Sequence, residues 1–251
     1  MKLHFKKYQA TGNDFVLLDN RNGLIKLSDD DVKRICDRHF GVGADGLMLI
    51  EKHPSLDFNL VYYNSDGSQS LCGNGTRAAM KMASSLGIVN GKASFNAYDG
   101  PHVAEIAGEV VKVKMKDVTI EEGTTSINTG SPHEIRFVDS LAKYPVVNAG
   151  RSLRNQLNAN VNFVELVSDS TIYVRTYERG VEDETLSCGT GVTAAALAAY
   201  FKGYNSPVCI KTLGGDLSVQ FLTKTYGHTV TFTDIFLIGP AKMVFEGDLE
   251  L

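Results

Sequence analysis

The sequence lacks several features that would place a protein in a particular class. Its 25 lysines and arginines against 29 acidic residues give a formal net charge of −4, so it has no basic excess of the kind that binds nucleic acid or an anionic membrane. No apolar run approaches the length of a transmembrane helix, and the N-terminal lysines are not followed by the apolar stretch of a signal peptide. We therefore expect a cytoplasmic globular protein without a nucleic-acid or membrane partner.

Cysteine is also scarce. The four cysteines, Cys36, Cys72, Cys188 and Cys209, form no CxxC pair and show no spacing typical of a zinc site. They are expected to be free thiols in a cytosolic protein that holds no metal. Cys36 falls on a predicted amphipathic helix and Cys209 in a predicted strand, so both are expected to be core residues.

The other two cysteines each open a repeated sixteen-residue pattern. Residues 72–87 and 188–203, aligned without gaps, share the cysteine, two early glycines, three alanines and a final glycine. Each copy predicts a helix that is opened by a glycine loop and closed by a glycine just beyond its last turn. Because the copies lie in opposite halves of a 251-residue chain, two similar halves are expected.

A cysteine at a helix N-terminus lies beside about half a positive charge and several unpaired N–H groups, which favour the thiolate. A carbon acid that is inverted loses a proton from one face and regains one on the other, so it needs one base and one acid. Two such thiols suit this chemistry, and their titrations would be coupled. The repeat thus predicts a pair of acid/base cysteines, Cys72 and Cys188.

Glycines beside each cysteine have a possible use in the same reaction. A carbanion next to a carboxylate builds negative charge on the carboxylate oxygens, and helix N-termini with exposed N–H groups stabilise such charge. Gly73 and Gly189 allow close approach to these N–H groups, while Asn74 and Thr190 offer side-chain donors. Loop geometry alone is the alternative explanation of the glycines.

Each cysteine helix is expected to be surrounded by strands. In the first half the patterns predict strands at 3–8, 15–18, 47–50 and 58–63, a helix with a capping box from Ser28 to His39, and a hairpin at 103–115. The second half repeats the order, with strands at 161–167, 171–177 and 207–211, and the halves join around 116–122. Residues 41–46 match GxGxxG, but they follow a helix and enter a strand, the reverse of a dinucleotide site.

Further polar residues are candidates for recognition, each with an open alternative. Asn13 and Asn64 lie where strands meet loops, where they could bind a ligand or form Asx turns. Glu178 and Arg179 could bind the two charges of an amino-acid group or form a solvated ion pair. His133 follows a rigid proline and could tune a thiol or be a structural histidine.

Seven ordered motifs cover nearly the whole chain and resemble those of diaminopimelate epimerases. They are GNDF at 12–15, RHFGVGADG at 38–46, NSDG at 64–67, CGNG at 72–75, GSPH at 130–133, YERG at 177–180 and ETLSCGTG at 184–191. The resemblance implies an isomerase that needs no pyridoxal phosphate or other cofactor and converts LL-2,6-diaminopimelate to the meso isomer, for lysine and peptidoglycan synthesis. It implies an α+β fold of two pseudo-symmetric domains (1–117 with 240–251, and 118–239), each a strand barrel around a central helix, and a homodimer with its site in the cleft between the domains.

Carried over by motif, the resemblance assigns roles to individual residues. Cys72 and Cys188 are implied to be the catalytic acid and base, and His133 and Glu178 to tune the thiols. The implied substrate-binding residues are Asn13, Asn64, Gly73, Asn74, Asn162, Glu178, Arg179, Gly189 and Thr190. Two positions depart from one common form of the pattern, since Gly46 replaces a glutamine and Ser131 an asparagine of some members.

Two other functions compete with this interpretation. Proline racemases and hydroxyproline epimerases resemble it in fold and cysteine pair, although the GNDF and YERG motifs supply the additional polar anchors that a second amino-acid head needs. A redox-sensing binding protein, in which Cys72 and Cys188 form a reversible disulfide, would show no substrate turnover. Exchange of the substrate α-proton with deuterated water distinguishes an epimerase from such a sensor.

Overall fold

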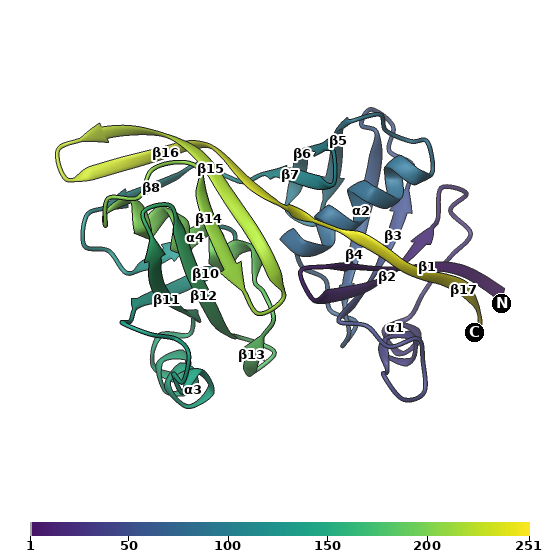
Figure 1. Cartoon of the computed structure of the whole chain (residues 1–251). Coiled ribbons are helices and arrows are strands. Elements are labelled where there is room, and N and C mark those ends of the chain that lie inside the picture. The colour runs from purple at the N-terminus through teal and green to yellow at the C-terminus, as the bar shows by residue number, and fades with distance from the viewer. Residues whose placement is uncertain (1) are drawn as a thin grey trace. The chain divides into compact units, whose positions relative to one another are not determined.

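The computed structural model describes residues 2–251, and contacts between residues divide them into two compact units (Figure 1). Unit 1 contains residues 2–113 and Pro240–Leu251, and unit 2 contains Lys114–Gly239. The chain thus first passes from unit 1 to unit 2 after Val113. The boundary expected from the sequence, after residue 117, lies four residues later. None of the helices in the described residues is both long and apolar enough to cross a membrane.

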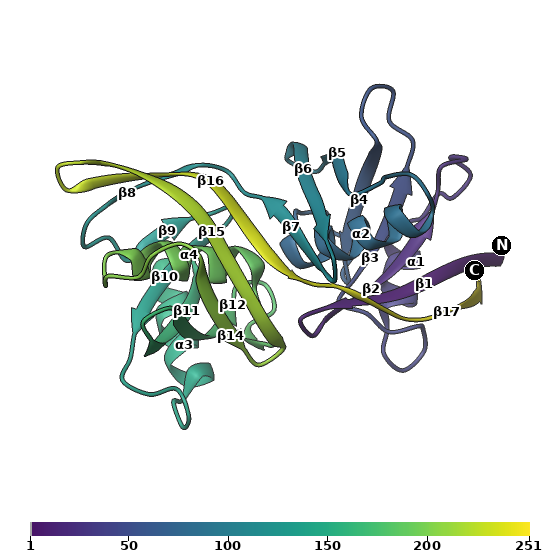
Figure 2. The same ribbon diagram turned by 45° about the horizontal axis from the view of Figure 1, so that its top comes forward.

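Unit 1 combines a curved set of strands with two helices, α1 (Asp29–Cys36) and α2 (Gly73–Ser85). Its strands are β1 (Lys2–Ala10), β2 (Asn13–Asp19), β3 (Gly46–Glu51), β4 (Phe58–Asn64), β5 (Lys92–Ala97), β6 (Gly100–Ala107), β7 (Val110–Lys114) and β17 (Lys242–Glu250). β17 pairs antiparallel with β1, which places the last residues of the chain beside the first ones (Figure 2).

Unit 2 also has two helices, α3 (Val146–Leu157) and α4 (Gly189–Tyr200). Its strands are β8 (Val118–Glu121), β9 (Ser126–Asn128), β10 (Pro132–Phe137), β11 (Asn160–Ser168), β12 (Thr171–Glu178), β13 (Asp183–Thr185), β14 (Val208–Thr212), β15 (Gly215–Tyr226) and β16 (Thr229–Pro240).

The two units share one order of strand pairing. In unit 1, β2 and β3 are parallel and joined through α1, β3 and β4 are antiparallel, and β4 and β5 are parallel and joined through α2. In unit 2, β10, β11, β12 and β14 repeat this order with α3 and α4 as the connecting helices. The sixteen-residue repeat therefore supplies the second connecting helix of each unit.

Each repeat helix lies inside the curve of its own strands (Figure 1). α2 contacts β1, β2, β3, β6 and β17, and α4 contacts β10, β11, β12, β14 and β15. Small side chains make this burial possible, because Ala78, Ala79 and Ala83 in α2 and a run of alanines in α4 let strands approach closely. Both helices end as predicted before a glycine in the left-handed region, Gly87 at φ 68° and Gly203 at φ 93°.

The α1 capping box is confirmed, since the Ser28 hydroxyl accepts from the Asp31 N–H while the Asp31 carboxylate accepts from the Ser28 N–H. The expected end at His39 is wrong, because α1 stops at Cys36. The Asp37 carboxylate accepts the N–H groups of His39 and Phe40, both at 2.7 Å, and so turns the chain out of the helix.

Two further differences from the sequence analysis concern unit 2. Cys209 is exposed, although it lies in the predicted strand, because the alternation along β14 buries Val208 and Ile210 and turns Cys209 to solvent. Helix α3 was not predicted, since it starts after Pro145 without a side-chain cap and buries only Val146 and Gly150. Cys36, by contrast, is buried as expected.

Candidate active site

Cys72 and Cys188 occupy equivalent positions in the two units. Each is the N-cap of its repeat helix, Cys72 with φ −125° and ψ 111° and Cys188 with φ −125° and ψ 113°. The extended N-cap conformation directs a side chain toward the first-turn N–H groups. Each unit therefore presents one thiol at the positive end of a buried helix.

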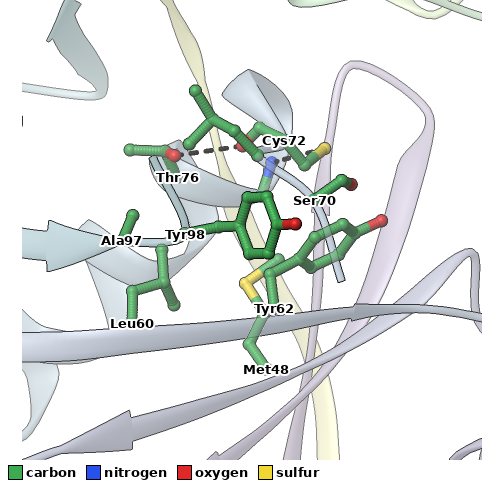
Figure 3. A pocket seen from close by; sticks show the side chains of 10 residues that line it. Met48, Leu60, Tyr62, Ser70, Cys72, Thr76, Ala97 and Tyr98 are labelled. Atoms are coloured by element: carbon green, nitrogen blue, oxygen red, sulfur yellow. Dashed lines mark hydrogen bonds between the residues drawn. The ribbon is translucent and has the colours of Figure 1, made fainter. Parts of the chain in front are cut away.

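The Cys72 sulfur has a donor and an acceptor in its own unit. Its Sγ accepts from the N–H of Gly75 at 3.3 Å, the bond drawn to the sulfur in Figure 3. It also lies 3.6 Å from Oδ1 of Asn13, to which the thiol can donate. The Asn74 amide donates to the same Asn13 oxygen at 3.4 Å. Cys72 can therefore be stabilised both as a thiolate, by the backbone N–H, and as a thiol, by Asn13.

A charged network fixes the orientation of the Asn13 amide. Its Nδ2 donates to Asp45 at 2.6 Å, and because a carboxylate only accepts, the amide oxygen must face Cys72. Arg38 donates to both Asp45 and Asp14, at 2.7 and 2.8 Å. Burial raises the pKa of Asp14, but hydrogen bonds from Arg38 and Lys7 outweigh it and hold that pKa at about 2. Asp14 is therefore ionised at neutral pH.

Arg77 is a fully buried cation on the Cys72 helix. Its guanidinium donates to the Thr11 hydroxyl at 2.9 Å and to the Pro240 carbonyl at 3.3 Å, and Nη1 is buried without a hydrogen-bond partner. Burial lowers its pKa to about 10, while the charge of Cys72 raises it. Arg77 thus ties α2 to the β1–β2 turn next to Asn13 and adds positive potential near the thiol. The matching position in α4 is Thr193, so unit 2 has a neutral residue where unit 1 has this cation.

Asn64 is the last residue of β4, the strand that precedes the loop to Cys72. Its amide nitrogen donates to the Ser68 carbonyl, the Ser68 hydroxyl and the Ser70 hydroxyl, at 3.1, 3.0 and 3.2 Å. These contacts hold the turn that follows β4 through donated hydrogen bonds, and ligand binding by Asn64 stays a prediction. Asn64 shapes the loop that leads from β4 to Cys72.

Cys188 is linked to a histidine through a hydroxyl group. The Thr190 Oγ1 lies 3.5 Å from Cys188 Sγ and 2.8 Å from Nε2 of His133. The Ser131 hydroxyl also reaches Nε2, at 2.9 Å, and receives a hydrogen bond from Asn160. A hydroxyl can accept from a thiol or donate to a thiolate, so Thr190 can serve both protonation states of Cys188.

His133 is neutral at physiological pH, and its tautomer follows from its neighbours. Asn162 donates through Nδ2 to Thr176 at 2.7 Å, so its oxygen accepts from Nδ1 of His133 at 2.8 Å and Nε2 is the acceptor. Burial lowers the pKa of His133 to about 4, opposed by the Asn162 hydrogen bond and assisted by the charge of Arg179. Nε2 of His133 therefore accepts one hydrogen bond, from the hydroxyl of either Thr190 or Ser131. When Ser131 donates it, the Thr190 hydroxyl hydrogen is left for the Cys188 thiolate.

The glycines of the two loops are needed for close packing. A Cβ on Gly191 would lie 2.3 Å from the Asn162 amide nitrogen, and a Cβ on Gly75 would lie 2.3 Å from the Met48 methyl carbon. Gly73 and Gly189 are buried at the first helical position of α2 and α4. First-turn N–H groups have no partner within their helix, so each loop offers donors for an anion.

Glu178 and Arg179 lie at the end of β12 in unit 2. The Arg179 N–H donates to the Asn160 side chain at 2.9 Å, and its exposed guanidinium donates to the Asn158 carbonyl at 3.0 Å. Asn160 thereby links Arg179 to Ser131 and to the His133 network. Sequence reasoning missed Asn160, as well as Asp45, Arg77 and Thr176, because a partner that is distant in sequence from the site residue it contacts has no local pattern.

The low pKa of His133 predicts a pH dependence of stability. A histidine with a pKa near 4 when folded and 6.5 when unfolded stabilises the protein above pH 6.5 and loses this contribution as the pH falls from 6.5 toward 4. We expect the free energy of unfolding to decline there by up to about 1.4 kcal/mol per pH unit. Urea titrations between pH 7 and 4.5 should show a flatter profile for His133→Gln. An equally steep profile in that variant would assign the decline to another group.

The remaining two thiols differ in their surroundings. Burial raises the pKa of Cys36 to about 11, so it is protonated at neutral pH, while Cys209 is exposed on β14. Within residues 2–251, no group of three or more histidine, cysteine or acidic side chains is arranged to hold a metal ion.

Comparison with solved structures identifies the fold. A PhzF-family phenazine biosynthesis protein of Bacillus anthracis superposes with a TM-score of 0.73 at 15% identity, and both chains are covered completely. A hydroxyproline epimerase of Agrobacterium vitis superposes with a TM-score of 0.72 at 14% identity, over 100% of this chain and 93% of that one. These likenesses confirm the predicted α+β fold of two similar parts.

Sequence comparison identifies the family. The family described as Diaminopimelate epimerase matches residues 5–121 and 125–244. The diaminopimelate epimerase of Flavobacterium psychrophilum is 46% identical over 98% of this chain and 99% of its own, and that of Aquifex aeolicus is 39% identical over 98% of each. This chain is therefore an isomerase that belongs to the diaminopimelate epimerase family.

Proposed function

We propose that this protein converts LL-2,6-diaminopimelate to the meso isomer without pyridoxal phosphate, with Cys72 and Cys188 as the two acid/base groups. The observation that carries the mechanism is the equivalence of the two thiols, which cap corresponding helices with the same backbone conformation. Inversion at one carbon needs two such groups acting on opposite faces. The names of the relatives support the choice of substrate.

In this mechanism one cysteine removes the α-proton as a thiolate while the other delivers a proton as a thiol. The neighbours of each sulfur suit both roles, since Cys72 has the Gly75 N–H and the Asn13 oxygen, and Cys188 has the reversible Thr190 hydroxyl. The reaction can therefore run in either direction through the same groups.

The substrate carboxylate at the reacting carbon is assigned to the two helix N-termini. As the proton leaves, negative charge spreads onto the carboxylate oxygens, where backbone N–H groups stabilise it. We assign this role to Gly73 with Asn74 and to Gly189 with Thr190. Asn13, Asn64, Asn162 and the pair Glu178 and Arg179 are assigned to the amino and carboxylate groups of the substrate.

His133 is assigned to tuning Cys188 through Thr190, because Nε2 of the imidazole lies 2.8 Å from the Thr190 hydroxyl and that hydroxyl lies 3.5 Å from the Cys188 sulfur. Glu178 is assigned to the same thiol from the end of β12. The two units are proposed to be the two epimerase domains, and the protein is proposed to act as a cytoplasmic homodimer.

The test is turnover of pure protein, dialysed and free of added pyridoxal phosphate. Incubation with LL-diaminopimelate followed by chiral separation should give the meso isomer, and hydroxylamine, which traps pyridoxal phosphate, should leave the rate unchanged. Turnover of L-proline or hydroxyproline in place of diaminopimelate would contradict the assigned substrate. Loss of activity with hydroxylamine would contradict the proposed chemistry.

Asp45→Asn is expected to weaken turnover because it removes the acceptor that holds the Asn13 amide. An asparagine at this position must present a donor either to Asn13 or to Arg38, both of which donate. We expect kcat/KM to fall about tenfold, the effect of one charge-assisted hydrogen bond. Asp30→Asn, on the exposed side of α1, is the matched control. Unchanged kinetics for Asp45→Asn would show that turnover does not depend on the hydrogen bond from Asn13 to the Asp45 carboxylate.

A further inference from the structure

Gly46 has no room for a side chain because Tyr62 covers it. A Cβ built on Gly46 would lie 2.5 Å from Cε2 of Tyr62, 2.7 Å from its hydroxyl oxygen and 2.6 Å from the Tyr63 carbonyl. Tyr62 lies opposite Met48 on the paired strand, so its ring leans diagonally along β3 to reach Gly46. The tyrosine hydroxyl thus occupies the space that a side chain at position 46 would fill.

This hydroxyl lies at the edge of unit 1 where the candidate site residues gather. Gly46 begins β3 and pairs with Phe15 of β2 on one side and with Asn64 of β4 on the other. β2 begins at Asn13, so Asn13, the Tyr62 hydroxyl and Asn64 come to the same end of three neighbouring strands. The loop to Cys72 leaves from that end.

Tyr62 and Cys72 also line one pocket. Figure 3 shows the rings of Tyr62 and Tyr98 beside Met48, with the Ser70 hydroxyl and the Cys72 sulfur on the hydroxyl side of the rings. Tyr62 is only 8% exposed and packs edge to face with Phe15, at 6.1 Å between ring centroids, so its ring is held in place. A fixed ring gives its hydroxyl a defined position, as a specificity contact needs.

We propose that Tyr62 determines substrate specificity. Its hydroxyl, which fills the space left by Gly46, would hydrogen bond to a polar group of the amino-acid substrate beside Cys72. The proposal rests on the proposed function. A phenol hydroxyl can donate to a carboxylate or accept from an ammonium group, and both groups occur in the substrate. In chains with a glutamine at position 46, a side chain from β3 would take the place that Tyr62 of β4 takes here.

Tyr62→Phe tests the hydroxyl alone. We expect kcat/KM for LL-diaminopimelate to fall about tenfold to a hundredfold, as for a lost hydrogen bond to a charged group. The melting-temperature increase on adding substrate should shrink. Tyr63→Phe, the next residue of β4 with its side chain on the other face, is the matched control. Wild-type kinetics and substrate shift in Tyr62→Phe would overturn the proposal.

A second pair of variants distinguishes binding from packing. Tyr62→Gln keeps a polar group and Tyr62→Leu keeps an apolar one of similar size. The proposal expects higher kcat/KM for Tyr62→Gln, although burial of an amide makes it the less stable of the two. Higher kcat/KM for Tyr62→Leu would contradict the proposal and assign Tyr62 to packing. Wild-type protein without diaminopimelate turnover would contradict the proposed function instead.

Discussion

Replacing either Cys72 or Cys188 by alanine should nearly abolish epimerisation. Without one thiol, inversion has no group to remove or deliver a proton on that face of the carbon. General acid or base catalysis by a positioned group contributes about 10²- to 10⁴-fold, so we expect kcat/KM to fall by at least that range in each variant. Steady-state kinetics with LL-diaminopimelate measure the loss.

Cys209→Ser is the control for these two variants, because Cys209 is exposed on β14 and belongs to neither helix N-terminus. It should have wild-type kinetics. The fold of all three variants should persist, because Cys72→Ala loses only the capping hydrogen bond from the Gly75 N–H, a cost of about 1 kcal/mol. If either Cys72→Ala or Cys188→Ala kept more than about a tenth of wild-type kcat/KM, a loss below about 1.4 kcal/mol, the two-thiol mechanism would be wrong.

Arg179→Lys should impair turnover although it preserves the charge. A guanidinium can bind a carboxylate through two parallel hydrogen bonds, whereas an ammonium acts as a single compact charge. If Arg179 holds the carboxylate of the non-reacting head, lysine should misplace the reacting carbon and lower kcat as well as raise KM. We expect kcat/KM to fall about tenfold to a hundredfold.

The matched control for Arg179→Lys is Arg154→Lys, which alters an arginine of unit 2 that pairs with Glu182 at 2.8 Å. That variant should affect stability by no more than about 1 kcal/mol and leave kinetics unchanged. Arg179 also donates to the Asn158 carbonyl, so a melting curve must accompany its kinetics. Unchanged kcat/KM with lower stability would limit Arg179 to that structural contact.

Much of the fold could be predicted because its signals are local. Ser28 and Asp31 form the expected capping box, and Gly87 and Gly203 end their helices in the left-handed region. The two copies of the pattern predicted two equivalent helices. Helix α3 has no side-chain cap, and the outward position of Cys209 depends on the register of β14 against β15, so neither could be predicted from a local pattern.

The candidate site divides in the same way. Each cysteine is followed directly by its own glycines. This repeated local pattern predicted that both cysteines lie at helix N-termini. The partners that orient the site are distant in sequence, since Asp45 reaches Asn13 across 32 residues and Arg77 reaches Thr11 across 66. Tyr62 over Gly46 depends on the pairing of β3 with β4. Such contacts follow from tertiary structure, which no motif encodes.

The central claim, two acid/base groups on opposite faces of one carbon, is tested most directly by isotope incorporation at early reaction times. LL-diaminopimelate is incubated with the protein in deuterated water, and product and remaining substrate are separated and analysed by mass spectrometry. With two thiols, the group that delivers a proton carries solvent deuterium, while the removed proton stays on the other thiol. The account predicts one deuterium at an α-carbon of the meso product and none in the recovered substrate. Equal deuterium in product and recovered substrate would indicate a single base and would contradict the account.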